Sequence, residues 1–128
     1  MDDNDIQFAV KRYKKAKSEG DYTIEEFYSD IVEHLNRRPM PFNTYDPFGL
    51  MNSVRMLWDT LEMSMAEVVE RSKMDMAKFS RRFVIPYRTV QAWCDGTNEC
   101  PVYIKMMICE ILGFYRRIVR FDMNGRRV

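Results

Sequence analysis

Residues 81–96, RRFVIPYRTVQAWCDG, gather side chains that can bind a partner through charge and hydrogen bonds. These side chains are three guanidinium groups and one amide: Arg81, Arg82, Arg88 and Gln91. Pro86 interrupts the stretch, because proline cannot continue a helix but suits the first turn of a new one. The residues therefore predict a helix, a tight turn and a second helix that leaves Arg88 and Gln91 on its outer side.

Residue types typical of catalytic or metal sites do not form a recognisable pattern. Cys94, Cys100 and Cys109 match neither the paired spacing of a zinc site nor an even disulfide framework, so we expect reduced thiols. His34 is the only histidine, and we expect it at the flank of an amphipathic helix. No paired carboxylates, phosphate loop or nucleophile with its base stands out. We predict a protein that is not an enzyme and that holds no metal or cofactor.

The composition is that of an ordinary globular domain, with 46% hydrophobic and 30% charged residues in a chain of 128. The acidic start MDDNDIQF does not resemble a signal peptide, and no apolar run is long enough to cross a membrane. We predict a cytoplasmic protein. Residues 1–60 hold 8 Lys and Arg against 11 Asp and Glu, whereas residues 61–128 hold 12 against 8. The basic second half is compatible with a nucleic-acid partner.

Helical periodicity dominates the first half. One helix is predicted over residues 5–17, ending near Gly20, with the basic run from Lys11 to Lys17 as a solvated face. Thr23 is the predicted N-cap of a second helix over 24–35, whose apolar stripe comprises Ile24, Phe27, Tyr28, Ile31, Val32 and Leu35.

A proline-rich loop over residues 36–49 separates these helices from the rest. We place a domain boundary there, between an amino-terminal helical extension (1–45) and a main domain (46–128). Asp46 and Pro47 would then begin a helix over Phe48 to Glu62.

Shorter helices are predicted beyond that point. Ser64 with Glu67 forms a capping box, and Asp75 caps the helix MAKFSRRF. Pro101 opens a later helix with a predicted buried stripe of Ile104, Ile108, Ile111 and Leu112. Residues 114–128 either extend that helix or form a strand with an Asn-Gly turn.

Helix 86–95 has two chemically different sides. Its predicted inner side comprises Pro86, Thr89, Val90 and Trp93. Its predicted outer side comprises Arg88, Gln91, Ala92 and Asp95. Gly96 ends the helix.

Two short helices joined by a tight turn, with polar residues outward on the second, form the helix-turn-helix arrangement. The segment MDMAKFSRRFVIPYRTVQAWCDGTNECPVYIKMMI, residues 74–108, resembles the lambda-repressor-like (Cro/CI-type) regulators of bacteria and phages. With the preceding helix the resemblance covers about residues 64–112. The matching core positions are Phe79, Ile85, Val90 and Trp93. The resemblance implies an all-α helix-turn-helix bundle, in which we expect Trp93 to contact Phe79 and Ile85.

The resemblance also implies a transcriptional regulator that binds duplex DNA sequence-specifically, usually as a homodimer. Base reading in the major groove would fall to Tyr87, Arg88, Gln91 and Ala92 of helix 86–95. Arginine suits guanine, glutamine suits adenine, and alanine can contact a thymine methyl group. Phosphates would be bound by Lys78, Arg81 and Arg82. The dimer interface would come from the stripe of helix 24–35 or from the aromatic tail Phe114, Tyr115 and Phe121.

Two departures from the family pattern keep a second function open. Val84 occupies a turn position where the family commonly has glycine, and a β-branched residue resists positive φ, so we expect a turn that is not left-handed. Asp95 and Glu99 put acids where relatives approach phosphate. The extension outside the resemblance also carries an acidic helix. The alternative is a phage or mobile-element protein that uses this fold to bind and inhibit a host protein, such as a defence nuclease.

Overall fold

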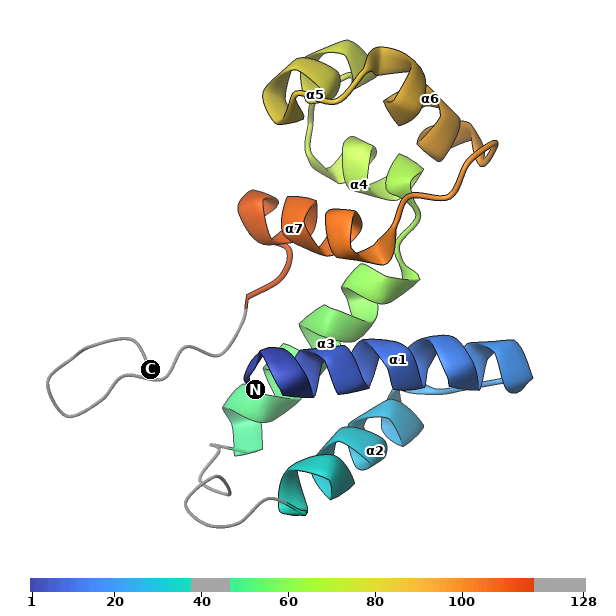
Figure 1. The fold of residues 1–128 in the computed structure, drawn as a ribbon. Coiled ribbons are helices and arrows are strands. Elements are labelled where there is room, and N and C mark those ends of the chain that lie inside the picture. Colours follow the sequence, from blue (N-terminus) through green and yellow to red (C-terminus); the bar gives the residue numbers. More distant parts are fainter. Residues whose placement is uncertain (38–46, 117–128) are drawn as a thin grey trace, which may run out of the picture. The chain divides into compact units, whose positions relative to one another are not determined.

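The structure is a computed structural model that describes residues 1–37 and 47–116 (Figure 1). This part of the chain forms seven helices and no strand, which confirms the predicted all-α class. In chain order they are α1 (Asp3–Glu19), α2 (Ile24–Asn36), α3 (Pro47–Glu62), α4 (Met65–Arg71), α5 (Met76–Phe83), α6 (Tyr87–Asp95) and α7 (Val102–Leu112).

The described residues divide into two compact units, Met1–Trp58 with Arg116, and Asp59–Tyr115. The division falls within α3, so one helix contributes to both units. The boundary predicted from the sequence, between residues 45 and 46, and the predicted N-cap Asp46 lie outside the described residues.

Side-chain caps begin the helices where the sequence predicted them. The hydroxyl of Thr23 accepts from the backbone N–H of Glu26 (3.2 Å) to start α2. Ser64 starts α4 and Asp75 starts α5 in the same way. Asp2 forms a capping box with Asp5 at the start of α1, a cap that the sequence analysis did not predict.

The core of the first unit forms where α1, α2 and the first part of α3 meet. Its buried side chains include Ile6 and Ala9 of α1, Phe27, Ile31 and Leu35 of α2, and Val54 and Leu57 of α3. The indole of Trp58 lies 5.3 Å from the rings of Tyr13 and Phe27, measured between centroids. Phe27, Ile31 and Leu35 of the α2 stripe, one of the two dimer interfaces expected from the sequence, are therefore occupied by this core, whereas Ile24, Tyr28 and Val32 are half-buried.

Polar contacts fasten α1 to α2. Arg12 pairs with Asp30 at 2.9 Å, and the Tyr22 hydroxyl donates to the same carboxylate oxygen. His34 is half-buried, with its Nε2 atom 3.0 Å from Oδ1 of the buried Asp5 and its ring stacked on Phe8. The single histidine therefore serves the interior of this unit.

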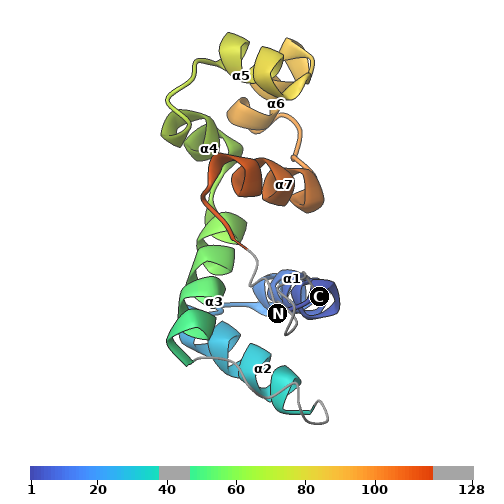
Figure 2. The same ribbon diagram turned by 90° about the vertical axis from the view of Figure 1, so that its left-hand side faces the viewer.

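In the second unit α4 lies between the α5–α6 pair and α7, as both ribbon views show (Figures 1 and 2). The fully buried side chains of this unit include Val68 of α4, Phe79 of α5, Val90 of α6 and Cys109 of α7. Tyr115, one of the aromatic residues proposed for a dimer interface, is also fully buried. Phe121 and residues 117–128 lie outside the described part of the chain.

The predicted buried stripe of α7 is partly wrong. Ile108 is buried, but Ile111 is 57% exposed and its place in the core is taken by other residues of the helix. The buried residues of α7 are Lys105, Met106, Ile108 and Cys109. Lys105 turns inward because its ammonium group donates to the backbone oxygens of Leu61 (3.0 Å) and Met63 (2.9 Å) at the end of α3. The helix ends at Leu112, before the tail for which the sequence left two conformations open.

Candidate nucleic-acid interface

The turn between α5 and α6 is left-handed at Val84, contrary to the sequence-based expectation. Val84 has φ 55° and ψ 45° and closes the carboxyl end of α5. A valine at positive φ is a steric outlier, because its branched β-carbon crowds the backbone. Its side chain is 90% exposed, so packing within the chain does not hold it there.

Hydrogen bonds between Ser80 and Ile85 explain this conformation. The N–H of Ile85 donates to the backbone oxygen of Ser80 (3.0 Å), and the Ser80 hydroxyl donates back to the oxygen of Ile85 (2.5 Å). A bond from the residue after the αL position back into the last helical turn is the usual closure of a helix end. Ser80 is buried and was missed by sequence reasoning, because a single serine inside a helix gives no signal of this role.

The start and back of α6 are fixed by the chain around them. The oxygen of Pro86 accepts from the N–H groups of Thr89 (2.9 Å) and Val90 (3.2 Å), so Pro86 is the N-cap and α6 begins at Tyr87, one residue after the predicted start. Phe79 and Val90 are fully buried, whereas Ile85 and Trp93 are half-buried. The ring of Phe79 lies 4.7 Å from that of Phe83. The outer side of α6 therefore has a defined direction.

The residues expected to read bases differ in their exposure to solvent. Arg88 and Gln91 are exposed, and Tyr87 is 44% exposed. Ala92 is half-buried, which leaves its methyl group less available than the sequence pattern implied. Within the described residues Arg88 forms no ion pair, so its guanidinium group is available to a partner.

The three expected phosphate-binding residues lie on α5. Lys78, Arg81 and Arg82 are all exposed. Neither Lys78 nor Arg81 forms an ion pair with any residue that the structure describes. The guanidinium carbon of Arg82 lies 5.4 Å from the centre of the Phe83 ring, an arrangement that orients the charge without neutralising it. α5 thus presents three exposed cations, none of which is paired with an acid of the described residues.

The loop after α6 carries an acid that is engaged locally. Oδ1 of Asp95 accepts from the hydroxyl (2.5 Å) and the N–H (2.8 Å) of Thr97. These hydrogen bonds lower the pKa of Asp95, so the carboxylate is charged at neutral pH. Gly96, at φ 81°, ends α6 as predicted. Asp95 and the exposed Glu99 therefore place negative charge beside the outer side of α6.

No family model, curated protein or solved structure matches the chain. The resemblance to lambda-repressor-like regulators therefore depends on the sequence motif alone.

The thiols lack the environment of reactive cysteines. Burial raises the pKa of Cys100 to about 11 and that of Cys109 to about 11. Burial and the nearby carboxylate of Asp95 also raise the pKa of Cys94. All three are free and protonated at neutral pH, whereas a nucleophilic cysteine needs a lowered pKa.

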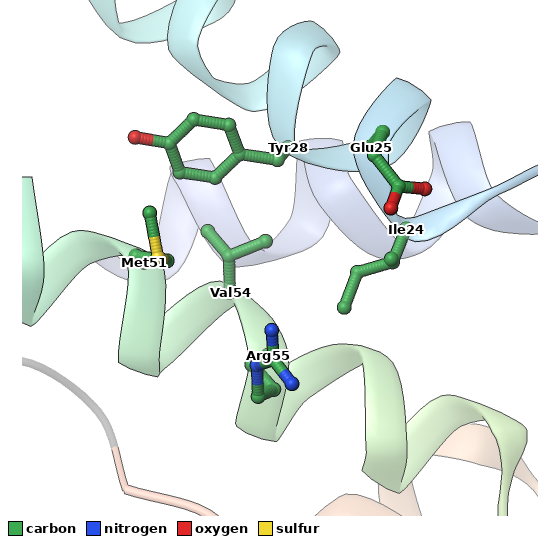
Figure 3. Close-up of a pocket in the computed structure, with 6 residues that line it drawn as sticks. All are labelled: Ile24, Glu25, Tyr28, Met51, Val54 and Arg55. Atoms are coloured by element: carbon green, nitrogen blue, oxygen red, sulfur yellow. The ribbon is translucent and has the colours of Figure 1, made fainter.

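The first unit has an apolar cavity of about 210 Å³ between α2 and α3 (Figure 3). Its lining combines apolar side chains with one acid and one base: Ile24, Glu25, Tyr28, Met51, Val54 and Arg55. Nearby on α3, Phe48 is 77% exposed and Met51 is 48% exposed. This α2–α3 groove is a second surface on which a partner could bind.

No helix within residues 1–37 and 47–116 is both long and apolar enough to span a bilayer. No group of three or more His, Cys, Asp or Glu side chains in that part could hold a metal ion.

Proposed function

We propose that the protein is a transcriptional regulator of bacterial or phage type that binds duplex DNA sequence-specifically. The α5–turn–α6 segment would act as a helix-turn-helix, with α6 in the major groove. The observation that carries this proposal is the outer side of α6, where Arg88 and Gln91 are exposed on a helix anchored by the buried Val90.

Each exposed group has a chemical counterpart on DNA. Arg88 can donate two hydrogen bonds to guanine, and Gln91 can exchange a donor and an acceptor with adenine. Lys78, Arg81 and Arg82 can neutralise backbone phosphates, which sets affinity and register without reading sequence. Tyr87 is partly exposed at the start of α6 and can contact either a base or a backbone phosphate.

A homodimer belongs to the proposal, because one helix reads only a few base pairs. The surface that best suits a dimer interface lies on α7. Tyr103, Met107 and Ile111 are 68%, 58% and 57% exposed. They are spaced four residues apart, so they lie along one side of the helix. An exposed apolar row of this kind favours self-association.

Binding to duplex DNA at two levels of specificity tests the proposal. The protein is titrated with random-sequence duplex across a salt series, and a random library is then selected for a preferred site. We expect micromolar binding to random duplex that weakens steeply with salt, and tighter binding to the selected site. Absence of duplex binding at low salt would refute the proposal.

The α2–α3 groove supports a second candidate function, the inhibition of a host protein such as a defence nuclease. Exposed Phe48 and Met51 beside the groove provide apolar surface, while Glu25 and Arg55 provide charges that could orient a protein partner. The two candidates differ in their prediction for DNA. Inhibition of a host protein would be favoured if the protein does not bind duplex DNA at low salt but binds a host nuclease, and if Met51→Glu abolishes that binding.

A further inference from the structure

Val84 combines backbone strain with nearly complete exposure. Its φ of 55° crowds a β-branched side chain against its own backbone. Val84 is 90% exposed, the highest value among the exposed large hydrophobic residues of the described chain. The free protein therefore carries the cost of the strain and gains no packing from the side chain that causes it.

The same chain solves this problem differently at its other left-handed helix ends. α6 ends at Gly96 with φ 81°, and α7 ends at Gly113 with φ 84°. Glycine adopts this conformation without a steric penalty. Lys73, the other non-glycine residue at positive φ in the described chain, is unbranched at its β-carbon. Among residues 1–37 and 47–116, Val84 is thus the only β-branched residue at positive φ.

Val84 lies beside the residues expected to contact DNA. It lies in the turn that leads into α6, between the exposed Arg81 and Arg82 of α5 and the exposed Arg88 of α6. In the proposed function the amino-terminal residues of α6 contact base edges, and this turn comes directly before them in the chain. The family pattern assigned apolar base contact to Ala92, but Ala92 is half-buried, whereas Val84 is 90% exposed and Tyr87 is 44% exposed.

We propose that Val84 is a specificity-determining residue that contacts the C5-methyl group of a thymine in the major groove. The inference rests on the proposed DNA-binding function. The thymine methyl is the apolar feature that distinguishes that base, and an isopropyl group can cover it while a glycine cannot. Burial of both groups on binding supplies the gain that the free protein lacks.

The first test compares stability with affinity in Val84→Gly and Val84→Asn, two residue types that tolerate positive φ. Both variants should melt about 2–6 °C higher than the parent, because the strain is removed. Both should bind the selected site about three- to tenfold more weakly, because the apolar contact is removed. Lower melting temperatures in both variants would overturn the inference that Val84 is strained.

The second test replaces each thymine of the selected site by deoxyuridine, which lacks only the C5-methyl group. The parent should lose about three- to fivefold in affinity at one position per half-site, and Val84→Gly should be insensitive there. Arg81→Gln is the matched control: it should bind more weakly at every site and keep the parent's sensitivity to deoxyuridine.

The results distinguish failure of the proposed DNA binding from failure of the proposed Val84 contact. A parent protein that binds no duplex overturns both. A parent that selects a site, with a Val84→Gly variant of equal affinity or unchanged deoxyuridine sensitivity, overturns the role of Val84 alone.

Discussion

Arg88 and Arg81 are both exposed arginines of the same segment, yet their removal should have different effects. Arg88→Ala should cost about 1–3 kcal/mol on the selected site and flatten the preference at one base pair, with random-duplex binding nearly intact. Arg81→Ala should weaken binding to all sequences and lower the salt slope by about one unit. Anisotropy titrations of both variants on selected and random duplex measure these effects. Equal losses on the two duplexes for Arg88→Ala would show that Arg88 contacts only phosphate.

Lys105 is a charged residue with a structural task. It is 9% exposed, burial lowers its pKa, and its ammonium group bonds to the oxygens of Leu61 and Met63. Lys105→Met keeps the length of the side chain but leaves two carbonyl groups without their donor. We expect a loss of about 1–3 kcal/mol in the free energy of unfolding.

Urea denaturation followed by circular dichroism measures that loss. The matched control is Lys78→Met, which removes an exposed ammonium group and should change stability by less than about 0.5 kcal/mol. Similar small effects for the two variants would mean that the bonds of Lys105 contribute no net stability.

At the scale of elements, the contact between α1 and α2 should weaken in acid. Burial raises the pKa of Asp30, but hydrogen bonds from Tyr22 and Arg12 and the charge of Arg12 outweigh it, so the pKa is lowered overall. A carboxyl with a lowered folded-state pKa stabilises the fold above its unfolded-state value, near 4, and loses that contribution as the pH falls through the folded-state value. The stabilisation by Asp30 is therefore complete at neutral pH and declines below about pH 4.

Asp30→Asn isolates this contribution. At pH 7 the variant should be less stable than the parent by about 1–2 kcal/mol, and the difference should shrink toward pH 3. Urea midpoints at pH 7, 4 and 3 provide the measurement. A difference that stays constant over this range would show that ionised Asp30 does not hold the two helices together.

Local sequence signals predicted where helices start. The features that could not be predicted, such as the buried face of α7, depend on contacts between residues far apart in the chain. Thr23, Ser64 and Asp75 could be recognised as caps because each bonds to a backbone N–H only three residues ahead. The orientation of α7 could not be predicted, because it depends on Lys105 reaching the end of α3, 42 to 44 residues earlier in the chain. Periodicity counts a lysine as an outward residue, so it assigned Ile111 to the core instead.

The candidate site was likewise predictable only in part. Pro86 and Gly96 fixed the limits of α6 from the sequence, and the outward direction of Arg88 and Gln91 followed from the helical repeat. The left-handed turn could not be predicted, because the preference of valine opposes it and the two bonds between Ser80 and Ile85 override that preference.

At the scale of the whole molecule, we expect a homodimer that depends on α7. Met107→Glu places a charge in the exposed apolar row of Tyr103, Met107 and Ile111, so it should yield a monomer without destabilising the fold. Sedimentation of parent and variant at tens of micromolar, with and without DNA, measures the change. Gln7→Glu, at an exposed position of α1, is the control and should not change the oligomeric state. A monomeric parent under both conditions would contradict the proposed dimer.

The division of the chain at Trp58 and Asp59 has an optical consequence. The chain has two tryptophans, and each unit holds one: Trp58 within the aromatic cluster of the first, and Trp93 on α6 of the second. Intrinsic fluorescence of Trp93→Phe therefore reports on the first unit, and that of Trp58→Phe reports on the second. Because α3 runs through the boundary, the two emission curves measure whether a shared helix makes both units unfold in one cooperative transition or lets them unfold separately.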